Sequence, residues 1–390
     1  MIVLNIFNER SDIGGEDVIF QLVGDCEIPG SLDIKSIKVK KYRVKNSLIN
    51  KIIAFFSGIF SVFSFFKFLA MFRKEKPDLI HVHNIFPFIS PSIFLAARLL
   101  RIPSVYHVHN FHLTCPVGSH FKDDTTCERC LRKSGLDSFL LDCRGNRFES
   151  LAYWVRFFIH RRLNVFGLLP TGLIVVSPFS RRRLLDAGYA DNKIHLLPNG
   201  VDQQAVVPLA PGPRETKSSI LFVGRLTVDK GVWDLIALSK IKVEWDFHLV
   251  GTGPLWDHIK FMKLPNVYLH GWKSEAQRSP LYASCDVAVV PSLCFETFGL
   301  TAVESMAAGI PTIVANHGGL ACFVESSKAV AGYSPGNIVE MESVINEILV
   351  SSKQQQAMRD AGLKLVAEYY TRDKFAKNLR KIYETVINKE

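Results

Sequence analysis

Short apolar runs that alternate with helix-length segments constrain this 390-residue chain more than any other feature. Such runs, bounded by turn residues, are typical of strands buried on both faces, and segments such as 90–101 and 178–188 are long enough for crossover helices. The alternation predicts parallel sheets with helices on both faces. The predicted strands are MIVLNIF, DLIHVH, SVYHVH, GLIVVS and KIHLLP in the first half, and SILFVG, DFHLVG, VYLHG, DVAVVP and PTIVA in the second.

The predicted strands form two sets, separated by LPNGVD (197–202) and the proline-rich VPLAPGP (207–213), which together are typical of a linker. We therefore expect two doubly wound domains, residues 1–198 and 199–370. Because sheets of this kind bind ligands beyond the carboxyl ends of their strands, the two domains are expected to face a central cleft. Residues 371–390 are expected to form a C-terminal helix that packs back on the N-terminal domain.

The formal net charge of +10 is unevenly distributed. Residues 1–200 contain 27 Lys and Arg against 17 Asp and Glu, whereas residues 201–390 contain 20 of each. A basic half is typical of a protein with an anionic partner, which could be nucleic acid, an acidic membrane surface or a phosphorylated substrate. An incidental basic surface is the alternative. Nucleic acid is not expected, since the basic residues are interleaved with apolar runs and no nucleic-acid-binding module is apparent.

The uncharged segment IIAFFSGIFSVFSFF (52–66) is the most apolar part of the chain. It is shorter than the roughly 20 residues that cross a membrane, and Lys51 and Lys67 flank it. We expect a helix that either belongs to the core or contacts a bilayer interface. The opening MIVLNIFNERSDIGG lacks the basic and apolar regions of a secretory signal. The expected location is therefore cytoplasmic.

The segment CFETFGLTAVESMAAGIP (294–311) has the start and stop signals of a helix. Thr297 is the predicted cap of a helix that begins at about Phe298, and Gly309 provides a left-handed stop before Pro311. The amides of the first turn would then be available to an anion.

Two glutamates, Glu296 and Glu304, belong to this segment. Helical rise separates them by roughly 12 Å, whereas the two carboxyl groups of a retaining glycosidase lie about 5–5.5 Å apart. The spacing instead favours contacts with the two ends of one ligand. A surface helix with two unrelated glutamates is the alternative.

Three glycine-containing loops follow predicted strands. In FVGRLTVDKGV (222–232), Arg225 and Lys230 stand between a strand end and a helix start, which is typical of a phosphate site. In GGED (14–17), paired glycines permit close backbone approach and positive φ, with a plain turn as the alternative. The loop LVGTGPL (249–255) has no third glycine, because position 256 is Trp, so a dinucleotide-dependent dehydrogenase is disfavoured.

Taken in order, the glycine pair, G-R-x4-K-G, and E-x7-E followed by A-x-G-x-P resemble the retaining GT4 glycosyltransferases, which have the GT-B fold. The resemblance covers the chain from Gly14 to Pro311. It is closest to bacterial transferases of surface polysaccharides, which share HVHNIFPFISPS (81–92) and HNFHLTCP (109–116). The E-x7-E motif with F-G-L inside it is specific, whereas the glycine pairs are not.

The resemblance implies a role for each matched residue. Arg225 and Lys230 would hold the donor diphosphate, Glu304 the ribose, and Glu296 the sugar. The remaining implied contacts are the amides of Phe298, Gly299 and Leu300 with the donor, Gly14 and Gly15 with the phosphates from the other domain, and His109 with the reacting centre. A buried structural histidine is the alternative for His109, and spacing does not separate it from His107, His112 and His120.

The implied reaction retains anomeric configuration by front-face attack, with the leaving phosphate as base. The family needs no catalytic metal, and the sequence contains no D-x-D pair of aspartates. Arg225, Lys230 and a helix dipole would supply the positive charge.

Four of the eight cysteines form a C-x2-C core with two outer members. This spacing predicts a structural zinc site, with reduced thiols as the alternative. A disulfide is disfavoured in a chain without an export signal. The transferases that the sequence resembles have a similar pattern. The four candidate ligands are Cys115, Cys127, Cys130 and Cys143.

These inferences combine into one functional expectation. The chain is expected to transfer a sugar from a nucleotide-sugar to a glycan acceptor carried on a polyprenyl diphosphate, in the synthesis of O-antigen, capsule or exopolysaccharide. It would act as a peripheral protein on the inner face of the cell membrane. The alternatives are a nucleotide-sugar epimerase of the same fold and a non-catalytic nucleotide-sugar binder.

Overall fold

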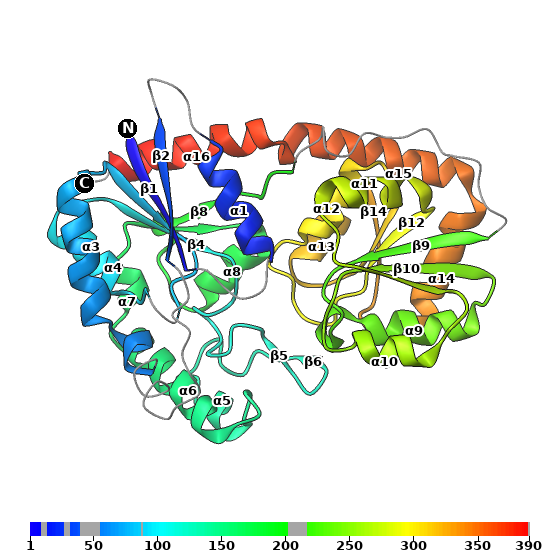
Figure 1. The fold of residues 1–390 in the computed structure, drawn as a ribbon, viewed down its shortest axis with the longest axis horizontal. Helices are drawn as coiled ribbons and strands as arrows, with labels where there is room; N and C mark the ends of the chain where they lie inside the picture. The colour runs from blue at the N-terminus through cyan, green and yellow to red at the C-terminus, as the bar shows by residue number, and fades with distance from the viewer. Residues whose placement is uncertain (9–13, 27–31, 40–54, 87–88, 202–216, 389–390) are drawn as a thin grey trace. The chain divides into compact units, whose positions relative to one another are not determined.

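The computed structural model forms two compact units, each built around one six-stranded parallel sheet (Figure 1). The first unit comprises residues 1–120, 127–198 and 375–390, and the second comprises residues 121–126 and 199–374. The proline-rich part of the predicted linker lies outside the described residues, and a cleft between the domains stays a prediction. The structure describes residues 1–8, 14–26, 32–39, 55–86, 89–201 and 217–388.

The sheet of the first unit has the strand order β2-β1-β3-β4-β7-β8. Its strands are β1 (Ile2–Asn8), β2 (Asp33–Val39), β3 (Leu79–Val82), β4 (Ser104–Val108), β7 (Gly172–Val175) and β8 (Ile194–Leu196). The helices of this unit are α1 (Gly15–Gly24), α3 (Val62–Glu75), α4 (Ser92–Leu99), α5 (Asp137–Leu140), α6 (Arg147–Arg162), α7 (Val165–Leu168), α8 (Pro178–Asp186) and most of α16 (Arg372–Ile387).

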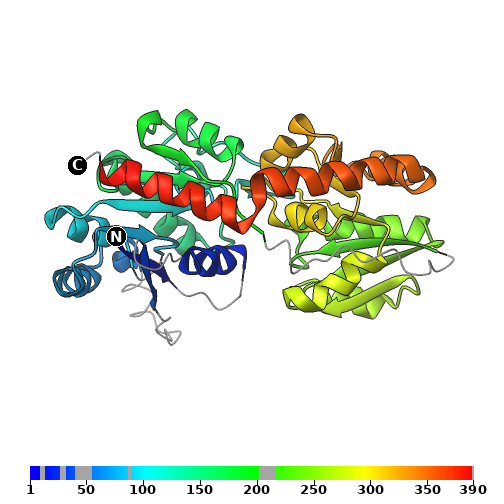
Figure 2. The same ribbon diagram turned by 90° about the horizontal axis from the view of Figure 1, so that it is seen from above.

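Alternate residues of the first sheet face two separate cores, as the period of a strand requires. Leu4 and Ile6 of β1 pack in one core with side chains of α3, α4 and α8. Val3 packs in the other core with side chains of α1 and α16. The red helix α16 of Figures 1 and 2 therefore covers the face that α1 covers. Its core-facing side chains follow helical spacing and are Phe375, Leu379, Ile382, Tyr383 and Val386.

The sheet of the second unit has the order β11-β10-β9-β12-β13-β14, which is the order 3-2-1-4-5-6 of dinucleotide-binding folds. Its strands are β9 (Ser218–Val223), β10 (Trp245–Val250), β11 (Val267–Gly271), β12 (Val287–Val290), β13 (Thr312–Ala315) and β14 (Val330–Tyr333). Its helices are α9 (Val232–Ile241), α10 (Trp256–Met262), α11 (Glu275–Ser284), α12 (Leu300–Ala307), α13 (Gly318–Ser326), α14 (Ile338–Val350) and α15 (Ser352–Leu365). The larger core lies under α9, α10 and α14.

All ten predicted strands are present, and the prediction of doubly wound parallel sheets is confirmed. The sequence did not predict β2 and β14, each of which is the last strand at one edge of its sheet. It also did not predict the short hairpin of β5 (Phe121–Lys122) and β6 (Thr125–Thr126).

The apolar segment 52–66 forms two helices where one was expected. Residues 55–59 are helical, and α3 begins after Ser61, whose hydroxyl accepts a hydrogen bond from the Ser64 amide at 3.2 Å. Residues 52–54 lie outside the described part. Among the described helices, none has both the length and the apolar composition to cross a bilayer.

Candidate functional site

The predicted residues of the second unit lie where the strand order of its sheet reverses. β9 and β12 are neighbours in the sheet, although β10 and β11 separate them in the chain. Sheets of this type bind ligands beyond the carboxyl ends of two such strands. The loop after β9 carries Arg225 and Lys230, and the loop after β12 carries Glu296. The fold therefore brings three residues predicted from two distant motifs to one edge of the sheet.

Lys230 and Glu296 form an ion pair at this edge. The Lys230 Nζ donates a hydrogen bond to Glu296 Oε1 at 2.5 Å, and the Ser292 hydroxyl donates to the same oxygen at 2.7 Å. Burial alone would raise the pKa of Glu296, but Lys230 beside it holds that pKa below its usual value. Burial alone would lower the pKa of Lys230, but the Glu296 carboxylate raises it. Both groups are therefore charged at neutral pH.

The loops after β9 and β12 are bound to each other by their backbones. The amides of Leu293 and Cys294 donate to the carbonyl of Asp229, at 2.9 and 3.1 Å. Gly231 has a φ of +67°, and a Cβ at this position would lie 1.9 Å from the carbonyl oxygen of Pro291. Only glycine fits there, so the loop that carries Lys230 is held directly against the end of β12.

Arg225 differs from Lys230 in its exposure. Its side chain is 66% exposed, and its guanidinium lies 3.8 Å from the Asp229 carboxylate. An exposed ion pair at this distance contributes little to stability. The guanidinium can therefore turn toward an anionic ligand at small cost.

Helix α12 begins at Leu300, two residues later than the predicted start at Phe298. Thr297 was predicted as the cap, but Gly299 occupies that position with a φ of +94°. A residue with a Cβ rarely adopts so positive a φ, so the turn that starts the helix selects glycine. The prediction failed because cap preference favours threonine, whereas the left-handed backbone of this turn selects glycine. Gly309, with a φ of +67°, ends the helix as expected.

The later start changes which amides face a ligand. The first amides of α12, from Gly299 onward, have no acceptor within the helix, as at any helix start. The predicted amides of Gly299 and Leu300 are among them. Phe298 lies before the helix, and its buried ring packs against Phe323 and Tyr370, with centroids 5.6 and 5.7 Å away. Its side chain therefore anchors the turn.

A second glycine pair supports the loop that carries Glu296. The Gly319 amide donates to the Glu296 carbonyl at 2.7 Å, and a Cβ on Gly319 would lie 2.6 Å from the Thr297 carbonyl oxygen. His317 Nε2 lies 2.8 Å from the Ser292 carbonyl oxygen and must donate its proton there. We did not single out this segment in the sequence. The signal was present, because H-G-G begins two residues after the predicted strand PTIVA ends, with Asn316 between them.

Glu304 lies in the interior of α12 and is buried. Its carboxylate accepts hydrogen bonds from the Arg278 guanidinium and the Tyr282 hydroxyl, each at 3.2 Å. Burial raises the pKa of Glu304, and Arg278 partly opposes that shift. Sequence reasoning missed both partners. They stand four residues apart on one face of α11, a spacing that carries no functional signal.

In the first unit, Gly14 and Gly15 begin α1 at the end of the chain segment that follows β1. Gly14 has a φ of −135°, so positive φ is not the reason for glycine here, contrary to the prediction. Among the described residues, a Cβ at either position would meet no atom within 4 Å. No described side chain therefore covers this backbone, although the Gly14 amide already donates to the Asp17 carboxylate at 3.0 Å.

His109 follows β4 and belongs to a stack of histidines on one face of β3 and β4. Its ring lies 4.1 Å from that of His107 and 5.0 Å from that of His83, and its Nε2 lies 2.8 Å from His83 Nδ1. Burial lowers the pKa of His109 to about 4 despite the opposing effect of Glu16. His107 is more deeply buried than His109.

The other histidines near His109 in the sequence have different surroundings. His120 is buried, and its ring nitrogens bond to the Thr114 hydroxyl and the Cys127 carbonyl, both at 2.8 Å. The ring of His112 packs edge-on against that of Phe86, at 5.9 Å.

Within the described residues, one group of three or more metal-ligand side chains has its ligand atoms within 4.8 Å of one another. It consists of His81, His83 and His107. Hydrogen bonds to neighbouring side chains already engage both ring nitrogens of His81 and of His83. We therefore interpret these rings as a hydrogen-bonded array.

The four predicted zinc ligands do not gather into such a group. The Cys130 thiol lies 3.7 Å from the Gly135 carbonyl oxygen, and burial, with Cys115 and Cys143 nearby, raises its pKa to about 12 in the absence of a metal. Bound zinc would itself deprotonate its thiol ligands. A zinc site at Cys115, Cys127, Cys130 and Cys143 therefore stays a prediction.

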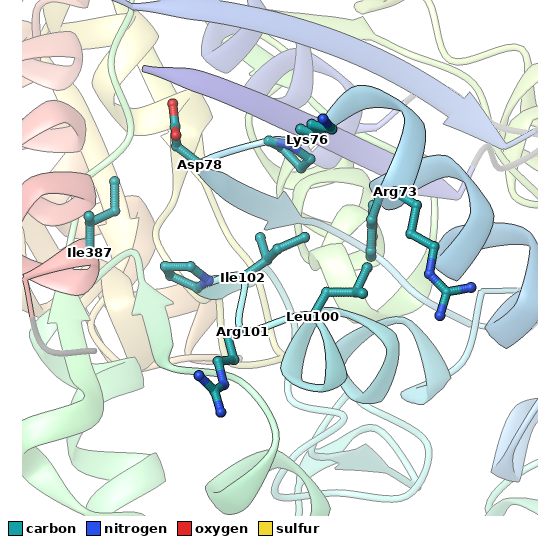
Figure 3. A pocket seen from close by; sticks show the side chains of 10 residues that line it. Arg73, Lys76, Asp78, Leu100, Arg101, Ile102 and Ile387 are labelled. Carbon is teal, nitrogen blue, oxygen red and sulfur yellow. The ribbon is translucent and has the colours of Figure 1, made fainter.

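A hollow of about 590 Å³ lies at the opposite edge of the first sheet, beside the residues that precede β3 and β4 (Figure 3). It contains none of the predicted site residues. Its ten lining residues are Phe72, Arg73, Lys76, Pro77, Asp78, Leu100, Arg101, Ile102, Pro103 and Ile387.

Two family models match the chain, one over each half. The model described as glycosyltransferase family 4 matches residues 40–205, and the model described as glycosyl transferases group 1 matches residues 209–365. Together they span both sheets and the loops that carry Lys230, Glu296 and His109.

Curated relatives resemble parts of the chain. A glycosyltransferase of Methanocaldococcus jannaschii is 31% identical over 181 residues, which are 44% of this chain and 46% of that protein. The MMP alpha-(1->4)-mannosyltransferase of Mycolicibacterium hassiacum is 27% identical over 240 residues, 59% of this chain and 57% of that protein. The chain thus spans about half the length of these relatives.

Solved structures resemble the whole chain. Sucrose-phosphate synthase from Thermosynechococcus elongatus has a TM-score of 0.75 at 17% identity, with 100% of both chains covered. The Anabaena protein Alr3699/HepE in complex with UDP and glucose has a TM-score of 0.68 at 15% identity, covering 98% of this chain and 99% of that one. At these identities the likeness establishes the fold, which is GT-B.

Proposed function

Because this chain belongs to the GT4 family of glycosyltransferases, we propose that it transfers a hexose from a nucleoside-diphosphate sugar to a glycan acceptor. The observation that carries the proposal is the cluster at the edge of the second sheet. There the Lys230–Glu296 ion pair lies at the point where the strand order reverses. Lys230, the exposed Arg225 and the helix start offer positive charge for the diphosphate of such a donor. Glu296 offers a carboxylate for its sugar hydroxyls.

The cationic groups would stabilise the leaving diphosphate. Lys230 and Arg225 provide two positive charges, and the first amides of α12 add hydrogen-bond donors at the positive end of the helix dipole. Charge that develops on a departing phosphate is stabilised most by such prearranged donors. We propose that these groups do the work that a divalent cation does in other transferases. We further propose that the departing phosphate acts as the base of a retaining, front-face reaction.

The two carboxylates would bind the two ends of the donor. Glu296 is ionised and accepts hydrogen bonds at one oxygen from Lys230 and Ser292. A carboxylate has further acceptor positions, which suit sugar hydroxyls. Glu304 would accept the ribose hydroxyls. From the first unit, His109 would contact the transferred sugar, and the open backbone of Gly14 and Gly15 would contact the phosphates.

We propose a lipid-linked acceptor, such as a glycan on polyprenyl diphosphate, and association with the inner face of the cell membrane. The support is a set of exposed apolar side chains between Phe56 and Phe66, with Lys67, Arg73 and Lys74 on α3. Exposed aromatic rings beside cations are typical of interfacial helices on anionic lipid. The exposed apolar side chains are Phe56, Phe60, Val62, Phe63 and Phe66.

A neighbouring helix contributes to the same region of the first unit. The ring nitrogen of His160 on α6 lies 3.0 Å from the carbonyl oxygen of Ile59. This helix exposes Phe148 and Phe158, and its last turn carries Arg161 and Arg162. The proposed membrane surface therefore has two helical contributors. A surface polysaccharide is the expected product.

A panel of nucleoside-diphosphate sugars, incubated with and without a bacterial lipid extract, tests the proposal. We expect release of nucleoside diphosphate from one donor, faster with the extract, and no release by the Glu296→Ala variant. Conversion of the sugar without release would instead indicate an epimerase. Donor binding without release or conversion would indicate a non-catalytic binder and would refute the transferase.

A further inference from the structure

Arg278 is a partly buried cation close to the start of α11, and the proposed chemistry gives it no role. Its Nη2 donates a hydrogen bond to Glu304 Oε1 at 3.2 Å, which links α11 to α12 beside it (Figure 1). Strands β11 and β12 belong to one parallel sheet, so the helices that follow them both begin at the edge that carries Lys230 and Glu296. The contact between Arg278 and Glu304 therefore lies near the proposed donor site.

Fold stability does not account for an arginine at this position. The Nε of Arg278 is buried without a hydrogen-bond partner in the described structure, and such an N–H costs free energy. The start of a helix is also the positive end of its dipole, which disfavours a cation. Apolar residues often replace a buried ion pair without loss of stability. Arg278 is therefore better explained by its effect on Glu304.

Arg278 and Tyr282 each hold one oxygen of the Glu304 carboxylate. The Tyr282 hydroxyl lies 3.2 Å from Glu304 Oε2. Burial raises the pKa of Tyr282 well above its usual value, so the hydroxyl keeps its proton and donates it. Donors at both oxygens fix the plane of the carboxylate. Each oxygen of an ionised carboxylate has two acceptor positions, so each keeps one beyond these contacts, and the pair suits two neighbouring hydroxyls of a ribose.

Arg278 also favours the ionised form of Glu304. Burial raises the pKa of Glu304, and Arg278 opposes that shift most strongly, while Glu275 raises the pKa further and Tyr282 lowers it. Among the described neighbours of α12, which include α15, β12 and β13, only α11 contributes the groups that shift this pKa. Hydrogen bonds to an ionised acceptor are roughly twice as strong as those to a neutral one, so the charge of Glu304 decides how firmly it holds a hydroxyl.

We propose that Arg278 and Tyr282 are positioning residues that hold the Glu304 carboxylate ionised and oriented to accept both hydroxyls of a ribose, and so make the site selective for ribonucleotides over 2′-deoxyribonucleotides. The inference rests on the proposed function, in which Glu304 accepts the ribose hydroxyls. All three side chains belong to the second unit.

Equilibrium binding of UDP, ADP, GDP and CDP to the full-length protein, each compared with its 2′-deoxy counterpart, tests the proposal. For the nucleotide that binds most tightly, we expect the ribose form to bind about tenfold or more tighter than the deoxy form, because one hydrogen bond to a charged group is lost. Equal affinities for the two forms would overturn the proposal. Failure of every nucleotide to bind would refute the proposed donor site itself.

Arg278→Met separates positioning from packing. At neutral pH it should bring the two affinities to within about threefold, because Glu304 loses its cation and its orientation. A loss of packing alone would weaken both nucleotides equally and leave their ratio unchanged, which would overturn the role of Arg278. Arg278→Lys keeps the charge and should restore part of the ratio, and Tyr282→Phe should lower the ratio less than Arg278→Met does. Lys240→Met, which removes an exposed lysine from α9, is the control and should leave the ratio unchanged.

The pH dependence of the ratio tests the charge of Glu304. Both nucleotides of a pair carry the same phosphates, so the ratio isolates the ribose contact. It should fall as the pH falls through the pKa of Glu304. Arg278→Met moves this fall to higher pH, so that raising the pH restores part of the ratio, whereas Glu275→Gln removes a repelling carboxylate and moves the fall to lower pH. A ratio in Arg278→Met that does not recover at higher pH would overturn the proposal that Arg278 keeps Glu304 ionised.

Discussion

At the scale of single residues, the charged members of the site could be predicted and their partners could not. Lys230 and Glu296 belong to glycine-containing loops at strand ends. Charged residues in such loops are typical of ligand-binding sites, so the sequence pattern could predict them. Ser292 and His317, which bond to this pair or its loop, are residue types that occur throughout any fold. Only the three-dimensional contact distinguishes them.

We predict that Lys230→Met lowers kcat/KM by about 10²–10³-fold, because a prearranged charge at a departing phosphate contributes on that order. The substitution also leaves Glu296 without its cation, so its pKa should rise. Turnover with the donor identified by the panel measures the effect, and circular dichroism checks that the fold is kept.

The matched control for this prediction is Lys240→Met, which removes an exposed lysine from the last turn of the adjacent α9. Its activity should stay within about twofold, since surface substitutions rarely matter. Equal losses in the two variants would mean that Lys230 acts only through net charge. Near-normal activity of Lys230→Met would refute the assignment.

At the scale of elements, the predicted strands were those buried on both faces. β2 (DIKSIKV) has one buried residue, Ile34, and otherwise exposed or half-buried ones, so it lacks the continuous apolar run that identified the others. β14 is a four-residue edge strand that contains glycine. The start of α12 was misplaced for a different reason. Its cap is Gly299 in a left-handed turn with a φ of +94°, whereas the cap preference used for the prediction pointed to Thr297.

We predict that Gly319→Ala disrupts the loop that carries Glu296. The added Cβ would meet the carbonyl oxygens of Thr297 and Glu296 at 2.6 and 2.8 Å, and backbone atoms cannot yield as a flexible side chain can. The loop must shift, so donor affinity should fall about tenfold or more, since misplaced groups lose most of their effect. Equilibrium binding of the nucleoside diphosphate measures this change.

Gly58→Ala is the control for this glycine, because its Cβ would make only an ordinary contact of 3.4 Å with the Arg156 side chain. It should bind nucleoside diphosphate as the unmodified protein does. If Gly319→Ala also binds normally, the close approach of α13 to the Glu296 loop is not needed for the site.

We predict that the double substitution Phe63→Ser and Phe66→Ser weakens binding to anionic lipid vesicles about 30-fold, at about 1 kcal/mol for each partly inserted ring. Both rings are largely exposed on α3, so stability should hardly change. Phe261→Ser, which removes an equally exposed ring from α10 in the second unit, should have no effect on vesicle binding. Sedimentation with vesicles distinguishes the variants, and equal loss in both would remove α3 from the membrane surface.

At the scale of the whole molecule, the sequence divides charge between the halves, and the fold gives each half its own sheet. The excess of ten positive charges belongs to residues 1–200, nearly all of them in the first unit. The second half is neutral overall and contains the proposed donor site. The division of charge could be predicted because a net charge is counted over many residues and does not depend on their packing. Which helices carry the exposed aromatic rings does depend on packing, so a residue count does not predict it.

We therefore predict that vesicle binding depends on salt in a way that separates charge from apolar insertion. Between about 0.1 and 1 M salt the screening length falls from about 10 to about 3 Å, and each Lys or Arg near an anionic surface contributes about 1 kcal/mol. Binding to anionic vesicles should fall more than tenfold over this range, whereas the weak binding to zwitterionic vesicles should persist, because the rings of α3 do not depend on salt. If high salt abolishes binding to anionic and to zwitterionic vesicles alike, charge alone attaches the protein. If binding to anionic vesicles does not depend on salt, the basic half has no role in it.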